Sequence, residues 1–429
     1  MSSPFDTIVA PITGPGPAPV AVLRLTGPDS KRIAASLAGR QEEQLEPRMA
    51  QFQSFCTGDE GYLILFEKGK SYTGEESVEM SIHGSRASIQ SLMDAAMDLG
   101  ARLAEPGEFT QRRFMNGHID LTEAEAVRDT IDAETDSQLR LANAMREGAL
   151  HRKISMLSDQ LIGVLAAIEA SVDFSEEIGE VDPFPLLAPM KHVREECRKL
   201  LDTARVGKII REGLRIAIVG PPNAGKSSLL NHLVNQDRSI VTEIPGTTRD
   251  YVEESADFNG YPVVLIDTAG LRETTDPVES IGVQRSRTIA ANADIVWFLT
   301  DAQEPVDQAM WQFDRPVVWI ANKTDLASAP FGFIGISCAT GEGIPDLVKS
   351  ALEFFDMPLG IAIQARHEAE LIETDRELAL AQEVLEHGRP PDLAAVGLRS
   401  AIQALGRITG QTADADIITR IFRDFCIGK

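Results

Sequence analysis

Two glycines, a lysine and a pair of serines stand at fixed spacing between Gly220 and Ser228. The run fits G-x-x-x-x-G-K-[ST] at every defined position, with an apolar segment before it and a helix-like segment after it. Glycine lets backbone N–H groups turn towards a phosphate, Lys226 can reach the outer phosphates, and the Ser227 hydroxyl can hold Mg²⁺. The alternative is a chance match in a glycine-rich turn. The residues predicted to bind nucleotide here are Asn223, Ala224, Gly225, Lys226, Ser227 and Ser228.

Three further motifs stand in order at the carboxyl ends of apolar segments. The Asp267 carboxylate can hold Mg²⁺ through water, and the N–H of Gly270 can contact the γ-phosphate. The Asp325 carboxylate can accept both N–H donors on the edge of guanine, a pair that adenine lacks, so specificity for GTP follows. The residues of these motifs are Asp267, Thr268, Ala269, Gly270, Asn322, Lys323, Thr324, Asp325, Ser337, Cys338 and Ala339. Four ordered motifs at strand ends predict a P-loop GTPase of the doubly wound α/β class.

Leucine occupies position 271, directly after the Asp267–Gly270 motif. Ras-like GTPases place a water-orienting glutamine there. A leucine side chain neither orients water nor neutralises charge, so another group must do both for fast hydrolysis. The candidates are Asn223, the polar stretch Gly246–Asp250 and the carboxylates after Arg272, and the residues alone do not decide between them.

Composition narrows the class of protein. The chain has 429 residues, a formal net charge of −24 and four widely spaced cysteines without metal-ligand spacing. The length predicts about three domains. The acidic balance argues against a general nucleic-acid coat, but it leaves room for a local basic patch or a basic partner. No apolar run approaches the roughly 18 residues of a membrane span, and the first residues lack signal-peptide features, so we expect a reduced, cytoplasmic chain without a membrane or structural disulfides.

The segments around the motifs predict a multidomain α/β chain. Residues 1–118 combine apolar strands with a helical pattern at Ser85–Leu99 and resemble an α+β domain. Residues 119–211 and 357–429 have helical periodicity. The simplest architecture inserts a GTPase domain, residues 212–356, into one discontinuous all-α domain. The predicted core stripe of the last helical segment is Leu371, Leu378, Leu380, Val384 and Leu385.

The first helical segment has internal landmarks. Thr122–Glu125 fits a capping box, and one long periodic stretch follows it to about Ala170. The acidic residues 173–182 and the prolines at 183, 185 and 189 predict an interruption, with a second helix from about Pro189 to Ile210.

The chain resembles, from end to end, the bacterial tRNA-modification GTPases of the MnmE (TrmE) family. The most specific matches are the terminal Phe425–Lys429, Ile408–Gly410, Gly246–Asp250 and Pro106–Phe109. The resemblance implies a homodimer that works with a flavin-dependent partner of the MnmG (GidA) type, in a heterotetramer. Together the partners attach a carboxymethylaminomethyl-type group to carbon 5 of the wobble uridine in certain tRNAs. The N-terminal domain is implied to dimerise and to bind a 5-formyl- or methylene-tetrahydrofolate.

The resemblance also implies the cation sites. K⁺ supplies the charge that an arginine finger gives elsewhere, and Ser227 and Thr248 hold Mg²⁺. Glu279 is implied to orient the attacking water through another water, which answers the question that Leu271 raises. The implied K⁺ ligands are the Asn223 side chain and the backbones of Thr242, Ile244 and Thr247. The same stretch adds Thr242, Glu243, Ile244, Pro245, Gly246, Thr247 and Thr248 to the GTP-binding residues.

For the folate, the resemblance implies Arg24, Glu79, His118 and Lys429. The family more often has lysine where this chain has His118, and histidine is largely neutral at pH 7. Cys426 lies in the matching tail, with a role near the folate. Cys338 replaces the usual alanine of the last guanine motif, where the backbone makes the contact, so little effect is expected.

Two other classes compete with a tRNA-modifying enzyme. A ribosome-assembly or signalling GTPase would carry the same guanine motifs and act as a nucleotide-gated interaction module, but such proteins usually have a basic RNA-binding domain. A membrane-remodelling GTPase would need an amphipathic or apolar anchor, which the sequence lacks. Binding of a reduced folate by residues 1–118 separates the enzyme from the interaction module.

Overall fold

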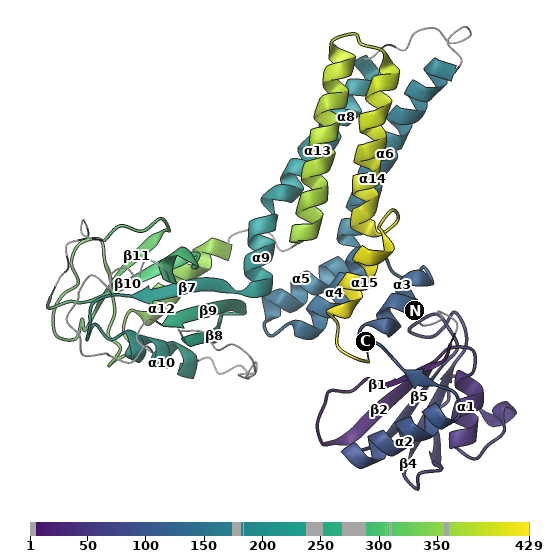
Figure 1. The fold of residues 1–429 in the computed structure, drawn as a ribbon. Coiled ribbons are helices and arrows are strands. Elements are labelled where there is room, and N and C mark those ends of the chain that lie inside the picture. The colour runs from purple at the N-terminus through teal and green to yellow at the C-terminus, as the bar shows by residue number, and fades with distance from the viewer. Residues whose placement is uncertain are drawn as a thin grey trace. The chain divides into compact units, whose positions relative to one another are not determined.

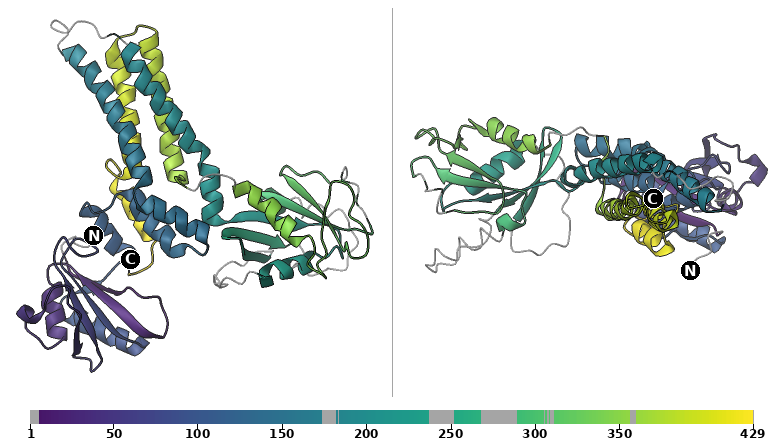
Figure 2. Two further views of the ribbon diagram at one scale, coloured as in Figure 1. Left: turned by 180° about the vertical axis from the view of Figure 1, so that it is seen from behind. Right: turned by 90° about the horizontal axis from the view of Figure 1, so that it is seen from above.

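The structure, a computed structural model, describes residues 6–173, 182, 184–236, 252–267, 289–304, 306, 308, 311–355 and 360–428. The chain forms two compact units, whose elements Figures 1 and 2 show. The first unit contains Met1–Arg128, Leu150–Gly179 and Pro391–Lys429, and the second contains Asp129–Ala149 and Glu180–Pro390. The domain boundaries expected at residues 118, 211 and 356 stay predictions.

The first unit is built on a sheet with the strand order β3-β4-β5-β2-β1-β6, in which only β1 and β6 pair in parallel. Two helices cover one face of this sheet (Figure 1). Side chains alternate along the strands, so Leu23 and Met80 pack against those helices while Arg24 and Glu79 lie on the other face. The elements are β1 (Ile8–Pro11), β2 (Ala18–Thr26), α1 (Ser30–Leu37), β3 (Gln51–Ser54), β4 (Glu60–Phe66), β5 (Ser77–Gly84), α2 (Arg86–Asp98) and β6 (Arg102–Leu103). The α+β character expected for this segment is confirmed.

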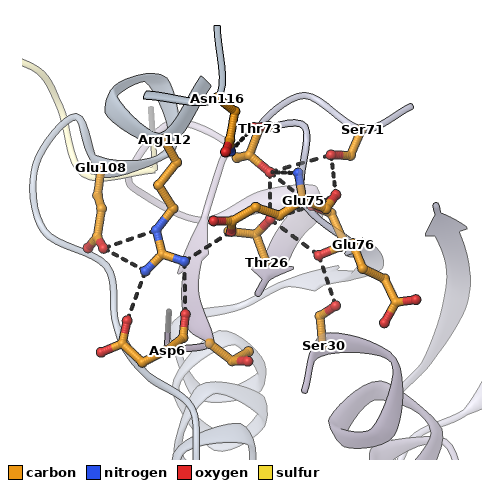
Figure 3. Close-up of polar contacts among 12 residues, drawn as sticks. Asp6, Thr26, Ser30, Ser71, Thr73, Glu75, Glu76, Glu108, Arg112 and Asn116 are labelled. Carbon is orange, nitrogen blue, oxygen red and sulfur yellow. Dashed lines mark hydrogen bonds and ion pairs between the residues drawn. The ribbon is translucent and has the colours of Figure 1, made fainter. Parts of the chain in front are cut away.

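Helix α3 (Glu108–Met115) carries a charge network that joins strand ends and loops (Figure 3). The Arg112 side chain is 5% exposed and donates to the carboxylates of Asp6 and Glu108 at 2.9 Å and of Glu75 at 3.0 Å. Arg102 donates to Asp6 and Glu108 as well. Burial alone would raise the pKa of Glu108, but the hydrogen bonds from Arg102 and Arg112 outweigh it and hold that pKa below its usual value. The network therefore stabilises this unit while its carboxylates are charged.

Several helices stand where the sequence predicted one long helical stretch. They are α4 (Leu121–Asp132), α5 (Asp136–Arg146) and α6 (Ala149–Asp173). Thr135 caps α5, and Gly148 has a positive φ of 76° between α5 and α6. The expected capping box at Thr122–Glu125 is wrong, because Asp120 Oδ1 accepts from the Glu123 N–H at 2.7 Å and Glu123 Oε2 accepts from the Asp120 N–H at 2.9 Å. The apolar periodicity did not reveal the ends of these helices, because the apolar spacing of one helix continues in the next.

Helix α6 packs beside α14 (Pro391–Thr409), where Arg399 donates to Glu169 at 2.6 Å. Residues Ala149–Val172 are long and apolar enough to cross a membrane by length and composition alone, and they are the one such helix in the described part of the chain. Core helices pass the same test, so this single match is a weak indication.

The C-terminal tail docks on the beginning of α3. Phe422, in the last turn of α15 (Ala415–Arg423), and Phe425, which follows the helix, pack against Leu121 and Ala124. The Gly107 N–H donates to the Cys426 carbonyl at 3.3 Å, and a Cβ on Gly107 would lie 2.4 Å from the Phe422 carbonyl oxygen. Only glycine fits at this approach, where φ is 68°.

The second unit contains a sheet with the order β12-β11-β10-β7-β9-β8, parallel throughout except between β8 and β9. Because parallel strands run in the same direction, the carboxyl ends of β7, β9, β10 and β11 lie at one edge of the sheet (Figure 1). The strands are β7 (Leu214–Val219), β8 (Val252–Phe258), β9 (Tyr261–Asp267), β10 (Ile295–Asp301), β11 (Val317–Asn322) and β12 (Ile334–Gly335). The doubly wound class is confirmed, although β12 is shorter than the expected Phe333–Ile336.

The helices of the second unit also correct two expectations. They are α5, α8 (Phe184–Asp202), α9 (Ala204–Glu212), α10 (Lys226–Gln236), α12 (Ile344–Leu352) and α13 (Ala365–Glu386). Helix α8 begins at Phe184 and includes Pro189, so the prolines do not delay its start. Leu380 is 53% exposed, because Leu371, Leu378 and Leu385 recur every seven residues on the face of α13 that is buried.

The charge network of α3 predicts a stability that falls in acid. The pKa of Glu108 is lowered in the folded chain, so its contribution is present above the unfolded pKa and is lost as pH falls through the folded pKa. We expect native-state hydrogen exchange in the full chain to show less protection of β1, β2 and β5 at pH 4 than at pH 7. Glu108→Gln should lower that protection at pH 7 by about 2–4 kcal/mol and flatten the pH dependence.

Glu43→Gln is the matched control, since Glu43 is exposed and far from the network in sequence and contacts. Its effect should stay within about 0.5 kcal/mol. Equal protection in Glu108→Gln and the parent at both pH values would contradict a stabilising role for the network.

Candidate functional site

The loop after β7 is shaped by three unusual backbone positions. Gly220 has a φ of 149°, and a Cβ there would lie 2.0 Å from the carbonyl oxygen of Leu299 on β10. Asn223 has a φ of 62° and Gly225 a φ of 98°. A Cβ on Gly225 would lie 2.2 Å from the Asn322 amide nitrogen. The glycines of the motif are therefore required by close approaches of β10 and Asn322, as well as by backbone rotation.

Lys226 lies over this loop at the start of α10. Its Nζ donates to the carbonyls of Gly220 at 3.1 Å and Pro221 at 2.9 Å. Burial lowers the pKa of Lys226, and the nearby Asp267 carboxylate opposes that effect. The ammonium group thus stands over the loop among weak neutral acceptors, which a phosphate would replace with charged ones.

Hard oxygen ligands meet beside the lysine. The Ser227 hydroxyl donates to Asp267 Oδ2 at 3.4 Å, across the ends of β7 and β9. A hydroxyl and a carboxylate suit Mg²⁺, which binds few protein ligands and takes the rest from phosphates and water. Among the described residues, no group of three or more His, Cys, Asp or Glu side chains is placed to hold a metal ion.

Asn322 joins the phosphate side of the site to the base side. Its Nδ2 donates to the Ala224 carbonyl at 2.8 Å, and its Oδ1 accepts from the Cys338 N–H at 3.1 Å. Asn322 is only 3% exposed, so both bonds are shielded from water. The loop after β7 and the turn after β12 therefore keep a fixed separation.

Asp325 is held at the exposed end of the same edge. Its Oδ1 accepts from the Ser337 hydroxyl at 2.6 Å, and Ser337 itself is fully buried. This bond orients the carboxylate and leaves its second oxygen, and further lone pairs, for a ligand. Burial raises the pKa of the neighbouring Cys338 to about 11, so its thiol is protonated at neutral pH.

A carboxylate that the sequence reasoning missed lies under Lys323. Asp301 ends β10, and its Oδ2 accepts from Lys323 Nζ at 2.6 Å. Lys323 has a φ of 66°, in the left-handed region that few residues other than glycine adopt. The contact orients the lysine stem along the base side of the site. Its sequence signal was faint, because Asp301 lies 22 residues before its partner.

The other predicted nucleotide residues divide into two groups. Ser228 is exposed in the first turn of α10, Ala339 is exposed in the base turn, and Thr324 lies against Gly335. The residues that fall outside the described part of the chain are Thr242, Glu243, Ile244, Pro245, Gly246, Thr247, Thr248, Thr268, Ala269, Gly270 and Glu279. Of the expected K⁺ ligands, Asn223 is therefore the one described, and its side chain is exposed.

The first unit brings Arg24 and Glu79 together as directly opposed residues of β2 and β5. Arg24 donates through Nε at 3.0 Å and Nη2 at 2.8 Å to Glu79 Oε1. The Arg24 guanidinium also lies 4.6 Å from the ring centre of Tyr72 and 5.4 Å from that of Phe109. This partly buried ion pair offers a carboxylate and a guanidinium side by side, one group that accepts hydrogen bonds and one that donates them.

The structure describes the remaining expected folate residues to different extents. His118 is exposed, and its ring covers Gly74, where a Cβ would lie 2.3 Å from the ring Nε2. Gly428 reaches β1, where its own Cβ would lie 2.1 Å from the Pro11 oxygen. Cys426 is exposed, and Lys429 falls outside the described residues. Tyr72 was not predicted, since a single aromatic residue in a turn-rich loop has no periodic signal.

Comparison with known proteins places the whole chain in one family. Residues 7–118 match the family described as "GTP-binding protein TrmE N-terminus", and residues 121–426 match the MnmE helical domain. The tRNA modification GTPase MnmE of Moorella thermoacetica is 40% identical over 464 aligned residues, covering 99% of each chain. The protein of the same name from Parvibaculum lavamentivorans is 41% identical over 440, covering 99% of this chain and 100% of its own. That from Akkermansia muciniphila is 39% identical and covers both chains completely.

Among solved structures, the G domain of the T. maritima FeoB iron transporter matches 33% of this chain and 98% of its own, with 24% identity and a TM-score of 0.26. The family models and the full-length relatives agree over nearly every residue. The chain therefore belongs to the family of the tRNA modification GTPase MnmE.

Proposed function

We propose that this chain hydrolyses GTP and takes part in modifying tRNA. The observation that carries the proposal is the Asn322 amide, which holds the loop after β7 and the base turn together in the order that the guanine motifs require. In the reaction, a water oxygen attacks the γ-phosphorus as the bond to the bridging oxygen breaks, giving GDP and phosphate. Lys226 and the loop N–H groups would bind the phosphates, and Ser227 with Thr248 would hold Mg²⁺, which would neutralise charge on the phosphates.

K⁺ is the proposed second cation of hydrolysis. Asn223 with the backbones of Thr242, Ile244 and Thr247 would hold it, and it would supply positive charge beside the bridging oxygen. Glu279 would orient the attacking water, a role that Leu271 cannot fill. The support from the structure is the exposed Asn223 side chain at the rim of the loop.

The first unit is the proposed folate-binding part. The Glu79 carboxylate would accept the paired N–H donors of a pterin edge, and Arg24 would donate to its carbonyl. His118, Lys429 and the tail around Cys426 would lie near the rest of the ligand. The ligand is a 5-formyl- or methylene-tetrahydrofolate, which would supply one carbon to the tRNA reaction.

The remaining partners follow from the same proposal. The chain would act in the cytoplasm as a homodimer through its N-terminal domain. With a flavin-dependent partner of the MnmG type, it would attach a carboxymethylaminomethyl-type group to carbon 5 of the wobble uridine. The support is the full-length similarity to relatives named as tRNA modification GTPases.

Guanine specificity provides the first prediction. Asp325→Asn should lose at least one charge-assisted bond to the base, a cost of about 1.5–3 kcal/mol in GTP binding. Xanthine nucleotides should bind better to this variant, because an amide can donate to their extra carbonyl. Asp314→Asn, an equal charge change at an exposed site, is the control. Unchanged GTP affinity of Asp325→Asn in equilibrium titration would remove Asp325 from the site.

Hydrolysis should depend on K⁺. Because an arginine finger is worth roughly 10³–10⁵ in rate, the cation replacing it should raise single-turnover hydrolysis in KCl at least about tenfold over NaCl at equal ionic strength. Asn223→Ala should abolish the difference, and Glu279→Ala should slow hydrolysis in KCl. Asn292→Ala is the control, because Asn292 precedes β10 at the end of that strand away from the phosphate loop. This variant should behave as the parent. Equal parent rates in both salts would refute the K⁺ role.

The tRNA reaction has its own test. Nucleoside analysis of tRNA from a strain lacking this protein should show the wobble uridine without its carbon-5 group, restored by the parent chain but not by Asp325→Asn. A wobble uridine that is unchanged by the deletion would favour an interaction module that is gated by nucleotide.

A further inference from the structure

The loop between β4 and β5 is fixed by the end of α3 and the residues that follow it. Asn116 Nδ2 donates to the Thr73 carbonyl at 2.8 Å, and Arg112 contacts the Glu75 carboxylate (Figure 3). Arg113 Nη1 donates to the Tyr72 carbonyl at 3.1 Å. Each contact fixes a different residue of the loop, so the loop presents Tyr72 in one position.

Two guanidinium groups lie over the Tyr72 ring. The Arg113 guanidinium is 4.9 Å from the ring centre, and that of Arg24 is 4.6 Å away. The Tyr72 hydroxyl bonds the Thr110 hydroxyl at 3.0 Å, which sets the rotation of the ring. Such stacking holds a guanidinium plane in place without consuming its N–H donors.

The two arginines differ in what balances their charge. Arg24 is paired with Glu79, so the charges of that pair cancel locally. Arg113 has no carboxylate within ion-pair distance among the described residues, and the Tyr72 carbonyl takes one of its five donors. Arg113 is half-buried, and Tyr72, whose ring its guanidinium contacts, also contacts the Arg24 guanidinium of the Arg24–Glu79 pair. Helix α3 brings two arginines to this loop, and Arg112 is paired with the carboxylates of Asp6, Glu75 and Glu108, so Arg113 is the one whose charge no described carboxylate balances.

We propose that Arg113 is a ligand-binding residue that contacts a carboxylate of the glutamate tail of the reduced folate. A planar guanidinium with free donors matches a carboxylate through two parallel hydrogen bonds. The Arg24–Glu79 pair then binds the pterin end, and Arg113 binds the tail. This inference rests on the proposed folate site and adds a residue to it that determines affinity for the tail.

The test compares a ligand that has the tail with one that lacks it. Calorimetry on the full chain measures 5-formyltetrahydrofolate, and competition measures 6-methyltetrahydropterin, which carries no glutamate. Arg113→Gln should weaken folate binding about tenfold and leave the pterin affinity within about twofold. Arg113→Lys should retain part of the folate affinity, because it keeps the charge and loses the planar stack. Arg24→Ala should weaken both ligands.

Arg86→Gln is the matched control, since Arg86 is an exposed arginine on α2, across the sheet from Arg24 and Glu79. It should bind both ligands as the parent does. Equal folate affinity in Arg113→Gln and the parent would overturn the inference, as would an equal loss for folate and pterin, which would mean that Arg113 acts only by holding the loop. A parent chain that binds neither ligand would instead refute the proposed folate site itself.

Discussion

One buried amide decides the geometry of the nucleotide site. Asn322 bonds the Ala224 carbonyl and the Cys338 N–H, and Gly225 lacks a side chain because the same amide occupies that space. Asn322 is 3% exposed, and its amide both donates and accepts a hydrogen bond. A shift of this side chain would therefore leave buried polar groups unpaired. The separation between phosphate groups and base is therefore set before any ligand arrives, which reduces the ordering cost of binding.

In the first unit, ion pairs rather than an amide hold separate segments of the chain together. Its sheet places Arg24 opposite Glu79, and Arg112 on α3 joins the chain before β1 to the loop before β5. The aromatic ring of Tyr72 is then fixed beside Arg24 by residues of the same helix. The Arg112 network needs charged carboxylates, so the order of this loop depends on pH. The Asn322 contacts involve no group that titrates in this way and do not share that dependence.

The sequence predicted the nucleotide site better than the surroundings of the proposed folate site, for a physical reason. The loop at Gly220–Ser228 is contiguous, so spacing alone encodes its shape. Arg24 and Glu79 are 55 residues apart, and only strand register, which depends on the whole sheet, brings them together. The stacked Arg113 and the Asp301–Lys323 pair went unrecognised because neither has a periodic or motif signal. Leu380 was wrongly predicted to be in the core, because the hydrophobicity of a residue does not show which side of its helix packs against a neighbouring helix.

A preorganised edge of the second unit is expected to bind both the guanine base and the phosphates. Equilibrium titration of the full chain with GDP, GTP and ATP under identical Mg²⁺ tests it most directly. We expect GDP and GTP to bind and ATP to bind at least about 100-fold more weakly, because adenine leaves the Asp325 carboxylate without its two donors. Equal affinity for ATP and GTP would contradict it.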